Sequence, residues 1–392
     1  MINKNLNTVI DFGKSNIKVC TFDDKKKIIS YGNESMEFSS EDNSSSLTLK
    51  KIIRQSEKQI SNHIDGITLL IDHSKFFTID LSIKKNLDHL QLAEEIQKTA
   101  FLECSQIINN SNQKIKIINY FINKITIDQQ EVNKLPENLR DNSSIIFNYK
   151  LLCLPDEIFF KITNIFKENN IVIKKIFCSS IVRSASYLNH YKDKKYVAFL
   201  DIGFNRSSLI LYKHKKLVYI NNIAIGGHNI TKDISSVMSL GLDESEKIKK
   251  KFNELESDFS FLNEENNGEK IIKHLIKNKI SIDLLKKIIL ARVEELFNLI
   301  FEDLKLHNRE LSKNELYLVL IGNGSKLLNK NTFKLENIQS FKDIFFYDEN
   351  DKDICKLGLE NNLENLQEIE KLRKIQKKQG IFERFFNLFD KI

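Results

Sequence analysis

The sequence predicts an α/β protein made of two related lobes, because one pattern of short strands and turns occurs twice in it. Residues 196–225 hold three short apolar runs, and the first of them ends in an Asp-x-Gly turn at Asp201. Residues 7–31 repeat this order, with a matching turn at Asp11. Short apolar runs separated by turn residues are typical of strands. A pattern that recurs in this way indicates two similar structural units.

The two Asp-x-Gly turns indicate that the protein binds phosphate groups. Gly13 and Gly203 allow the backbone to approach a phosphate closely, where backbone N–H groups can bind the anion. A carboxylate would repel a bare phosphate, so Asp11 and Asp201 imply a Mg²⁺ ion that they hold through water. One such turn is weak evidence, because Asp-x-Gly is also a common tight turn. Two copies in two lobes predict a nucleotide whose phosphates are bound between them.

The bulk properties of the chain limit its functional class. A length of 392 residues suffices for two or more domains, and 41% hydrophobic residues predict a packed core. The net charge of +7 is modest for this length and does not indicate a nucleic-acid partner. Five cysteines without a C-x-x-C pair indicate a reduced, cytoplasmic protein with inert thiols. The histidines lack paired ligand spacing, which argues against zinc. No apolar run approaches the ~20 residues of a spanning helix.

The first lobe continues beyond its three strands and then gives way to an insertion. The pattern predicts a helix over 47–63 and strands over 66–72 and 76–81. From about residue 86 the character of the chain changes, and we expect an inserted subdomain. Its predicted elements are a helix over 90–110, strands over 116–127 and 144–153, and a helix over 156–169. It holds no cluster of convergent polar residues, so we expect it to serve interaction.

The second lobe carries polar residues with an ordinary structural explanation. A strand over 171–176 and a helix over 180–191 lead to Asp201, and another helix begins after Gly227. Asp243 and Glu246 fit a capping box at the start of a helix. Lys249 lies three residues after Glu246, on the same helix face, which is typical of a solvated ion pair.

The last predicted strand of the second lobe ends in a third glycine turn. A long helix over 281–304 carries Arg292 and Glu295, whose ordinary interpretation is a surface ion pair worth less than about 1 kcal/mol. The strand over 316–321 is followed by Gly322-Asn323-Gly324 and a predicted helix. Strand, Gly-x-Gly and helix in this order are a weak sign of a nucleotide-binding backbone.

These three glycine turns, in this order, resemble the phosphate and adenosine motifs of the actin, Hsp70 and sugar-kinase superfamily. Within it the sequence is similar to the bacterial cell-division protein FtsA. The similar segments are the connecting helix at 176–188, the Gly-Gly-x-x-Ile-Thr-x-Asp-Ile motif at 226–234, the Ala-Glu-x-x-Lys motif at 245–249 and the Ala-Arg-x-x-Glu motif at 291–295. Residues 84–164 take the place of the 1C subdomain of that family.

The resemblance implies an actin-like, two-lobed fold of duplicated RNase H-like domains with an inserted 1C-type subdomain. The implied subdomains are 1A (1–83 and 165–191), 1C (84–164), 2A (192–227), 2B (228–315), a 2A/1A completion with the adenosine motif (316–358), a charged linker (359–379) and a terminal helix (380–392).

The resemblance also implies ATP and Mg²⁺ as cofactors. Asp11 and Asp201 are the implied catalytic and Mg²⁺-binding residues. The implied nucleotide-binding residues are Gly13, Lys14, Ser15, Asn16, Lys18, Gly203, Asn205, Ser207, Gly226, Gly227, Glu246, Lys249, Gly322, Asn323, Gly324 and Ser325.

Two glycine turns depart from the family pattern. Where the family reads Asp-Ile-Gly-Gly-Gly-Thr, this chain has Phe204, Asn205 and Arg206 after Gly203. Without these glycines the backbone has fewer conformations available around a phosphate. Arg206 can contribute positive charge instead. Asn323 replaces the second glycine of the adenosine motif, although asparagine tolerates a positive φ better than most residues. We therefore expect ATP binding with weak or absent hydrolysis.

The end of the chain predicts a helix that lies on a membrane surface. Residues 371–378 are basic, and the segment 380–392 that follows is amphipathic. The predicted membrane-contacting residues are Ile381, Phe382, Arg384, Phe385, Phe386 and Phe389. The segment is similar to the membrane-targeting helix of FtsA. The alternative is a terminal helix that packs on the protein core.

As a whole, the resemblance implies a cell-division protein that assembles into filaments on the cytoplasmic face of the inner membrane, at the septum. It implies FtsZ, through its C-terminal tail, as a partner bound by residues 228–315, together with inner-membrane lipids, further copies of the chain and later division proteins. Two alternatives remain open. One is an active ATPase or phosphotransferase of the same fold, and the other is an actin-like adaptor for pilus assembly.

Overall fold

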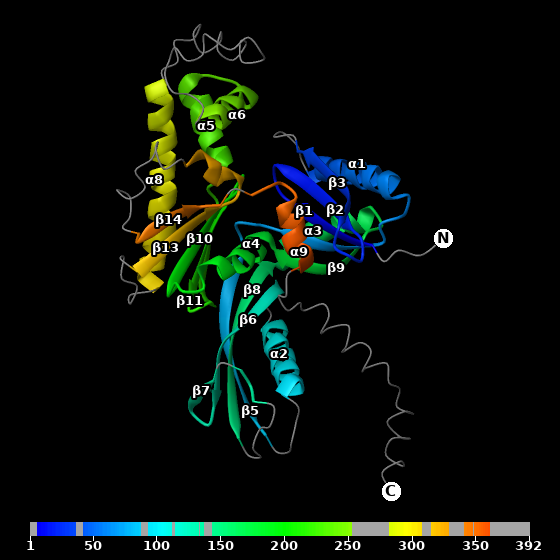
Figure 1. Ribbon diagram of the computed structural model, residues 1–392, viewed down its shortest axis with the longest axis vertical. Helices are drawn as coiled ribbons and strands as arrows, with labels where there is room; N and C mark the ends of the chain where they lie inside the picture. Colours follow the sequence, from blue (N-terminus) through cyan, green and yellow to red (C-terminus); the bar gives the residue numbers. More distant parts are fainter. Residues whose placement is uncertain are drawn as a thin grey trace. The chain divides into compact units, whose positions relative to one another are not determined.

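The computed structural model describes residues 6–36, 42–87, 93–111, 114–132, 134–136, 143–252, 282–307, 315–328, 341–347 and 349–360. The chain forms two compact units, which we describe separately (Figure 1). The first unit comprises residues 1–182 and 354–392, and the second comprises residues 183–353. Their boundary falls inside helix α4 (Ser179–Tyr187), so this one helix contributes residues to both units.

The main sheet of the first unit has the strand order β3-β2-β1-β4-β9. Its strands are β1 (Asn7–Phe12), β2 (Asn16–Phe22), β3 (Ile28–Ser35), β4 (Gly66–Ile71) and β9 (Val172–Cys178). The first three form an antiparallel meander, and β4 and β9 are added in parallel. Helices α1 (Asp42–Ile60), α3 (Asp156–Glu168) and α9 (Asp353–Glu360) belong to this unit. Helix α1 packs on β2 and β3.

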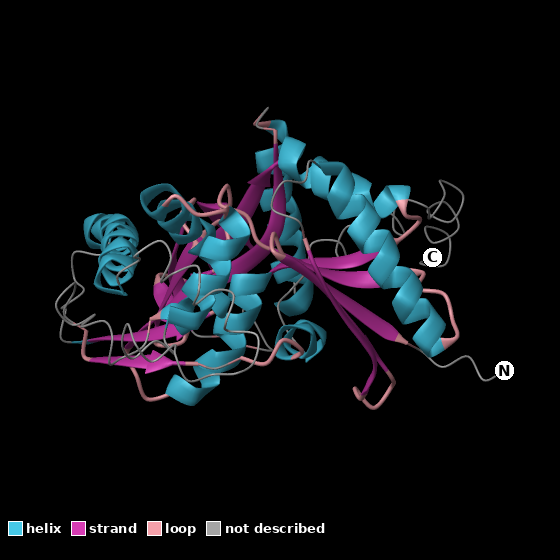
Figure 2. Cartoon of the chain, turned by 90° about the horizontal axis from the view of Figure 1, so that it is seen from above, coloured by secondary structure: helices cyan, strands magenta, loops and turns pink. Residues whose placement is uncertain are grey.

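The main sheet of the second unit has the same construction, with the order β12-β11-β10-β13-β14. Its strands are β10 (Tyr196–Ile202), β11 (Ser207–Lys213), β12 (Lys216–Ile223), β13 (Leu316–Ile321) and β14 (Asp343–Phe346). Again three strands form an antiparallel meander, and two are added in parallel. The matching strand orders confirm the predicted duplication, and the helices that accompany the strands (Figure 2) confirm the α/β class.

A four-stranded sheet, β5-β8-β6-β7, is inserted between β4 and β9. It comprises β5 (Phe77–Asn86), β6 (Ile115–Ile127), β7 (Gln130–Val132) and β8 (Ser144–Pro155), and helix α2 (Ala93–Asn110) packs on β5. The insertion has its own core, in which the rings of Phe101 and Tyr120 stack 3.8 Å apart. The predicted insertion is therefore confirmed.

The predicted start of this insertion is wrong by several residues. The sequence predicts a strand over 76–81 in the first lobe and a subdomain that begins at residue 84, but β5 pairs with β8 along its whole length. Exposed residues alternate with less exposed ones through Asn86, so the chain forms one long strand that crosses the predicted boundary. The other subdomain boundaries stay predictions.

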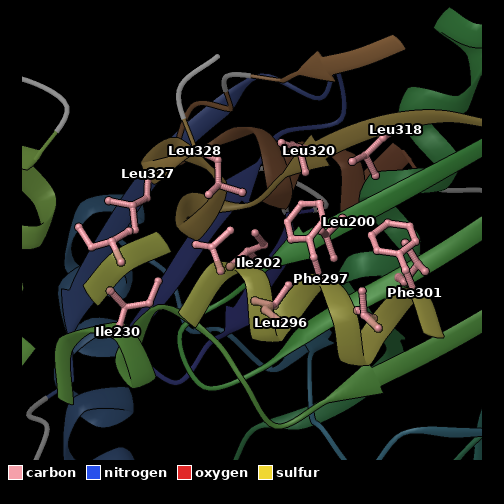
Figure 3. Close-up of a cluster of buried hydrophobic side chains, with 14 of the residues drawn as sticks. Leu200, Ile202, Ile230, Leu296, Phe297, Phe301, Leu318, Leu320, Leu327 and Leu328 are labelled. Carbon is pink, nitrogen blue, oxygen red and sulfur yellow. The ribbon is translucent and has the colours of Figure 1, made fainter. Parts of the chain in front are cut away.

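The core of the second unit forms between its sheet and the long helix α8 (Ile282–His307). Apolar side chains at helical spacing, among them Leu296, Phe297 and Phe301, are buried along one side of α8. Figure 3 shows these residues beside Leu200 of β10 and Leu318 of β13. The predicted helix over 281–304 is thus confirmed, and its apolar stripe faces the sheet.

The five cysteines are all free and buried. Burial raises the pKa of the Cys104 thiol to about 12, and it does the same for Cys153. Because the thiolate is the reactive form of cysteine, these buried thiols are inert, as predicted.

Candidate nucleotide-binding site

The first Asp-x-Gly turn joins β1 to β2. The Gly13 N–H donates to the Asn16 carbonyl at 3.1 Å, and a side chain at Gly13 would meet that same oxygen at 2.9 Å. Asp11 is 7% exposed and accepts a hydrogen bond from the Ser179 hydroxyl at 3.0 Å. Lys18, which is equally buried, lies opposite Asp11 in the register of the two strands. A carboxylate and an ammonium group therefore lie on neighbouring strands at one end of the first sheet.

The tip of this turn is anchored on one side and exposed on the other. The Ser15 carbonyl accepts from the Met36 N–H at 2.7 Å, and the Asn16 amide donates to Asn33 at 3.0 Å. Lys14 is exposed. Burial, together with the ammonium groups of Lys14 and Lys75, lowers the pKa of His73 to about 4. The turn therefore presents positive charge, which suits a phosphate.

The second Asp-x-Gly turn has the same backbone geometry. The Gly203 N–H donates to the Arg206 carbonyl at 2.9 Å, in the same relation as Gly13 to Asn16. Among the described residues, positive φ values do not occur at residues 203–206. A turn without left-handed residues can be built from ordinary amino acids, which explains why Phe204 and Asn205 can replace the family glycines without backbone strain.

This second turn is bound to the start of helix α5 (Gly227–Met238). The Gly227 N–H donates to the Gly203 carbonyl at 2.9 Å, and the His228 N–H donates to the Phe204 carbonyl at 2.8 Å. A side chain at Gly226 would lie within 2.5–2.7 Å of three backbone atoms of the turn. The N–H groups of Gly203 and Gly227, which we expected to face a phosphate, thus donate to protein carbonyls. Asn205 is exposed, and the buried Ser207 hydroxyl donates to the Ile225 carbonyl at 2.7 Å.

Asp201 is enclosed by positive charge. It is 1% exposed, and its Oδ2 accepts from Arg183 Nη1 at 3.1 Å and from Arg206 Nη2 at 3.0 Å. Arg183 Nε also pairs with Glu349 Oε2 at 3.1 Å. The other oxygen, Oδ1, lies 2.2 Å from the position of a side chain at Gly322. One carboxylate oxygen therefore accepts from two guanidinium groups, and the other leaves no room for a side chain at Gly322.

The third glycine turn packs directly on the second. Gly322 has a φ of +82°, and a side chain at Gly324 would lie 2.5 Å from the Ile202 side chain. The Ser325 hydroxyl donates to the Gly322 carbonyl at 2.7 Å, inside a short 3₁₀ helix (Asn323–Leu327) that replaces the predicted α-helix. The left-handed residue is Gly322 and not Asn323, which is exposed. Asn323 therefore causes no backbone strain at the position of the family glycine.

The ordinary interpretation of Glu246 and Lys249 is wrong. Helix α6 (Leu242–Lys251) begins after Gly241 as its N-cap, so Asp243 does not cap it. Glu246 and Lys249 are each 7% exposed, and thus form a buried pair. The Lys249 ammonium donates to Glu246 Oε2 at 2.6 Å, to Thr231 Oγ1 at 2.8 Å and to the Gly227 carbonyl at 2.8 Å. The pair joins α6 to the first turn of α5, next to the second glycine turn.

The charge state of Glu246 predicts an acid-sensitive term in the stability of the second unit. Burial alone would raise the pKa of Glu246, but Lys249 and Thr231 hold it below its ordinary value of 4.5. A carboxyl group with a lowered pKa in the folded state stabilises that state above its unfolded pKa, and the contribution is lost as the pH falls through the folded pKa. We expect Glu246→Gln to reduce stability at pH 7, and the difference from the native chain to shrink below about pH 4.5. Urea midpoints measured at pH 7 and well below pH 4.5 check this, and a constant difference would contradict it.

Arg292 is more than part of a surface pair. It binds Asp233 of α5 through Nε at 2.6 Å and Nη2 at 2.8 Å, in addition to its contact with Glu295. A bidentate arginine–carboxylate pair fixes geometry as well as charge. The pair therefore holds α8 against α5, which carries the Gly226-Gly227 turn.

Sequence reasoning missed Ser179, Arg183 and Glu349. Ser179 and Arg183 are four residues apart and so lie on one face of α4. Each contacts the aspartate of its own unit, Asp11 and Asp201 respectively. Arg183 could have been noticed as a single cation in an otherwise small and apolar helix. No sequence pattern marked Glu349 as a site residue, because only the folded structure brings it close to Arg183.

The predicted site residues thus gather in two sets. One set, in the first unit, comprises the residues of the Asp11 turn together with Lys18. The other, in the second unit, joins the Asp201, Gly226-Gly227 and Gly322–Ser325 turns with Glu246 and Lys249. Binding of one nucleotide by both sets stays a prediction.

Within the described residues, no group of three His, Cys, Asp or Glu side chains could hold a metal ion. Asp11 is the single carboxylate of the first turn and fits a water-mediated contact with Mg²⁺. The enclosed Asp201 does not fit one, since it is 1% exposed and its Oδ2 already accepts from two guanidinium groups.

Among the described residues no helix has the length and apolar character needed to cross a bilayer. The predicted membrane-contacting residues of 380–392 lie outside the described residues.

Two family models match this chain. The model described as type IV pilus assembly protein PilM matches residues 9–263, and the model described as cell division protein FtsA matches residues 198–375. FtsA of Helicobacter pylori (strain ATCC 700392 / 26695) is 22% identical over 169 residues, which are 43% of this chain and 33% of that protein. FtsA of Bacillus subtilis (strain 168) is 30% identical over 120 residues, which are 29% of this chain and 26% of that protein. The matched regions span about a third or less of these relatives.

A solved structure of a PilM–PilN type IV pilus biogenesis complex has the same fold. It aligns with a TM-score of 0.55 over 91% of this chain and 94% of that chain, at 12% sequence identity. Such a low identity bears on the fold alone, and it agrees with the two sheets of equal strand order. The pilus-assembly model covers well over half of the chain, and the cell-division model covers the second and third glycine turns. This chain therefore belongs to the PilM family of actin-like ATPase-fold proteins and is a relative of FtsA.

Proposed function

We propose that this chain is an ATP-binding, actin-like scaffold of the FtsA type. It assembles with copies of itself on the inner membrane, and it anchors FtsZ there at the division septum. ATP controls this assembly and binds whether or not Asp11 holds a hydrated Mg²⁺ ion, and hydrolysis is weak or absent. The observation that carries the proposal is the contact between the third glycine turn and Asp201, inside the segment that matches FtsA.

Several features of the second unit support a nucleotide-binding role over a phosphotransferase role. Gly322, Gly324 and Gly226 each lie too close to neighbouring atoms to accept a side chain without a shift. Glycine at such positions permits close backbone packing, which a nucleotide-binding surface also needs. A sugar kinase would require a carboxylate beside a sugar pocket, and the enclosed Asp201 does not provide one.

The membrane role depends on the amphipathic segment 380–392. One short interfacial helix binds a membrane weakly and reversibly, while many copies in a filament bind tightly through their effective concentration. The basic residues before it would each add about 1 kcal/mol on an anionic leaflet. We infer from this membrane role that the chain is located on the cytoplasmic face of the inner membrane.

Vesicle co-sedimentation tests the membrane and FtsZ parts together. We expect the full chain to pellet with anionic vesicles and to bring FtsZ from the same organism into the pellet. Phe385→Glu/Phe386→Glu should abolish pelleting while FtsZ binding in solution persists. Phe160→Glu, at a 53% exposed position of α3, is the matched control and should pellet normally. Equal pelleting of the double variant and the control would refute the membrane role, and failure to bind FtsZ would refute the division role.

The second candidate function is that of a pilus-assembly adaptor. It is favoured by the PilM model match over residues 9–263 and by the shared fold with the PilM–PilN complex. The immobilised full chain, offered FtsZ and PilN in parallel, separates the two. Retention of PilN without FtsZ would select the adaptor, and the reverse result would select the scaffold.

A further inference from the structure

Arg206 occupies a position in the second glycine turn at which the similar family motif has a small hydroxyl residue. It is buried, with 7% of its surface exposed. Its Nη2 donates to Asp201 Oδ2 at 3.0 Å, and its Nη1 donates to the Asp201 carbonyl at 3.3 Å and to Ser208 Oγ at 2.8 Å. The guanidinium is therefore held rigidly by its own hairpin.

Arg183 provides a second guanidinium on the same carboxylate oxygen. Its Nη1 lies 3.1 Å from Asp201 Oδ2, and its Nε lies 3.1 Å from Glu349 Oε2. Two guanidinium groups and two carboxylates, with side chains between 1% and 11% exposed, form one network, in which two positive charges meet the single negative charge of Asp201 at the turn. Buried charges persist when they are paired in this way.

This network leaves Asp201 poorly suited to hold a cation. Mg²⁺ requires near-octahedral oxygen ligands and usually keeps several of its waters. One oxygen of Asp201 receives both arginines, and only 1% of the surface of the residue is exposed. A hydrated cation needs more exposed oxygen than this arrangement offers.

We propose that the guanidinium of Arg206, supported by Arg183, supplies the positive charge of the second glycine turn that a metal ion would otherwise provide. Asp201 then positions the two arginines and holds no cation. The chain consequently binds a nucleoside triphosphate about equally well with and without Mg²⁺. This inference rests on the proposed ATP binding and adds to it that the second turn works without a metal.

Calorimetric titration of the full chain with ATP, in Mg²⁺ or in excess EDTA, is the first test. We expect the two dissociation constants of the native chain to agree within about threefold. Arg206→Thr should lower affinity in EDTA by about tenfold or more, because it removes the built-in charge. Lys195→Thr removes an exposed lysine from the same unit, six residues and so roughly 20 Å along the strand from Asp201, and should bind like the native chain. A native chain that loses about tenfold or more in EDTA would overturn the inference and leave ATP binding intact.

The variant Asp201→Asn provides an independent test of the inference if Arg206→Thr does not fold. A metal ligand at this position would make the variant lose more affinity in Mg²⁺ than in EDTA. Our inference predicts the same change in both conditions, because Asp201 positions the arginines and holds no ion. A loss in Mg²⁺ that exceeds the loss in EDTA by about tenfold or more would contradict us.

A double-variant cycle without nucleotide separates this inference from the proposed function. Asp201→Asn and Arg206→Thr should each lower the urea midpoint, and the double variant should shift it by less than the sum of the two. Additive shifts would mean that Arg206 does not pair with Asp201, which would overturn the inference. If the chain bound no ATP under either condition, the ATP part of the proposed function would fail, and this cycle would still decide whether the arginines neutralise Asp201.

Discussion

Gly322→Ala lowers the free energy of unfolding of the second unit by an expected 3 kcal/mol or more, on the order of the summed costs of a left-handed alanine and an overpacked core. The φ of Gly322 is +82°, and its added carbon would lie 2.2 Å from Asp201 Oδ1 and 2.9 Å from the Ile202 carbonyl. Neither atom can withdraw easily, because Asp201 is held by two arginines and Ile202 by its strand. ATP affinity should fall together with stability.

Gly241→Ala is the matched control for this prediction. Gly241 has a φ of −63° and meets no atom within 4 Å of an added carbon, so alanine should change stability by less than about 1 kcal/mol. The chain has no tryptophan, and circular dichroism in urea is therefore the suitable measurement. Equal midpoints for the two variants would mean that the third turn does not pack on Asp201.

Lys249→Met should destabilise the second unit by about 3–5 kcal/mol, because it leaves the Glu246 carboxylate buried without its cation. The ammonium makes three hydrogen bonds, to Glu246, Thr231 and the Gly227 carbonyl, and all three are lost. The double variant Glu246→Leu/Lys249→Met should recover most of the loss, since well-packed apolar residues can replace a buried ion pair.

The variant Lys250→Met distinguishes the loss of a buried contact from the loss of one positive charge. Lys250 also pairs with Glu246, at 3.5 Å, but its side chain is 71% exposed. An exposed pair contributes about 0–1 kcal/mol, so this variant should unfold close to the native midpoint. If Lys250→Met were as harmful as Lys249→Met, net charge and not the buried contact would be responsible.

The pattern of the chain was sufficient to predict the duplicated sheets, because each strand is a short apolar run with turn residues at both ends. Asp11 and Asp201 are each the second-last residue of the first strand of their copy, so their equivalence is visible without coordinates. The start of the insertion was not predictable with the same accuracy. The strand β5 alternates like any half-buried strand, and alternation alone does not tell which sheet it joins.

The spacing of charged residues along a helix did not reveal which of their ion pairs are buried. Glu246 and Lys249 have the spacing of a solvated helix pair, and Arg292 and Glu295 have the same spacing. The first pair is enclosed because α5 packs against it, and Arg292 reaches Asp233 on that same helix. Spacing along one helix defines its faces, but a neighbouring helix decides which face is buried.

The sequence by itself determined that two Asp-x-Gly hairpins recur, that a third glycine turn follows, and that the fold is α/β, because strand and turn propensities act over a few residues. The actin-like architecture was implied by the resemblance of these motifs to a known superfamily. Only the tertiary structure decided that Arg183, Arg206, Glu349 and Gly322 surround Asp201. These residues come from four separate segments, and their charges and close contacts exist only after the strands have paired. The charge of the second turn is thus a property of the folded unit, since buried ion pairs form only where packing excludes water.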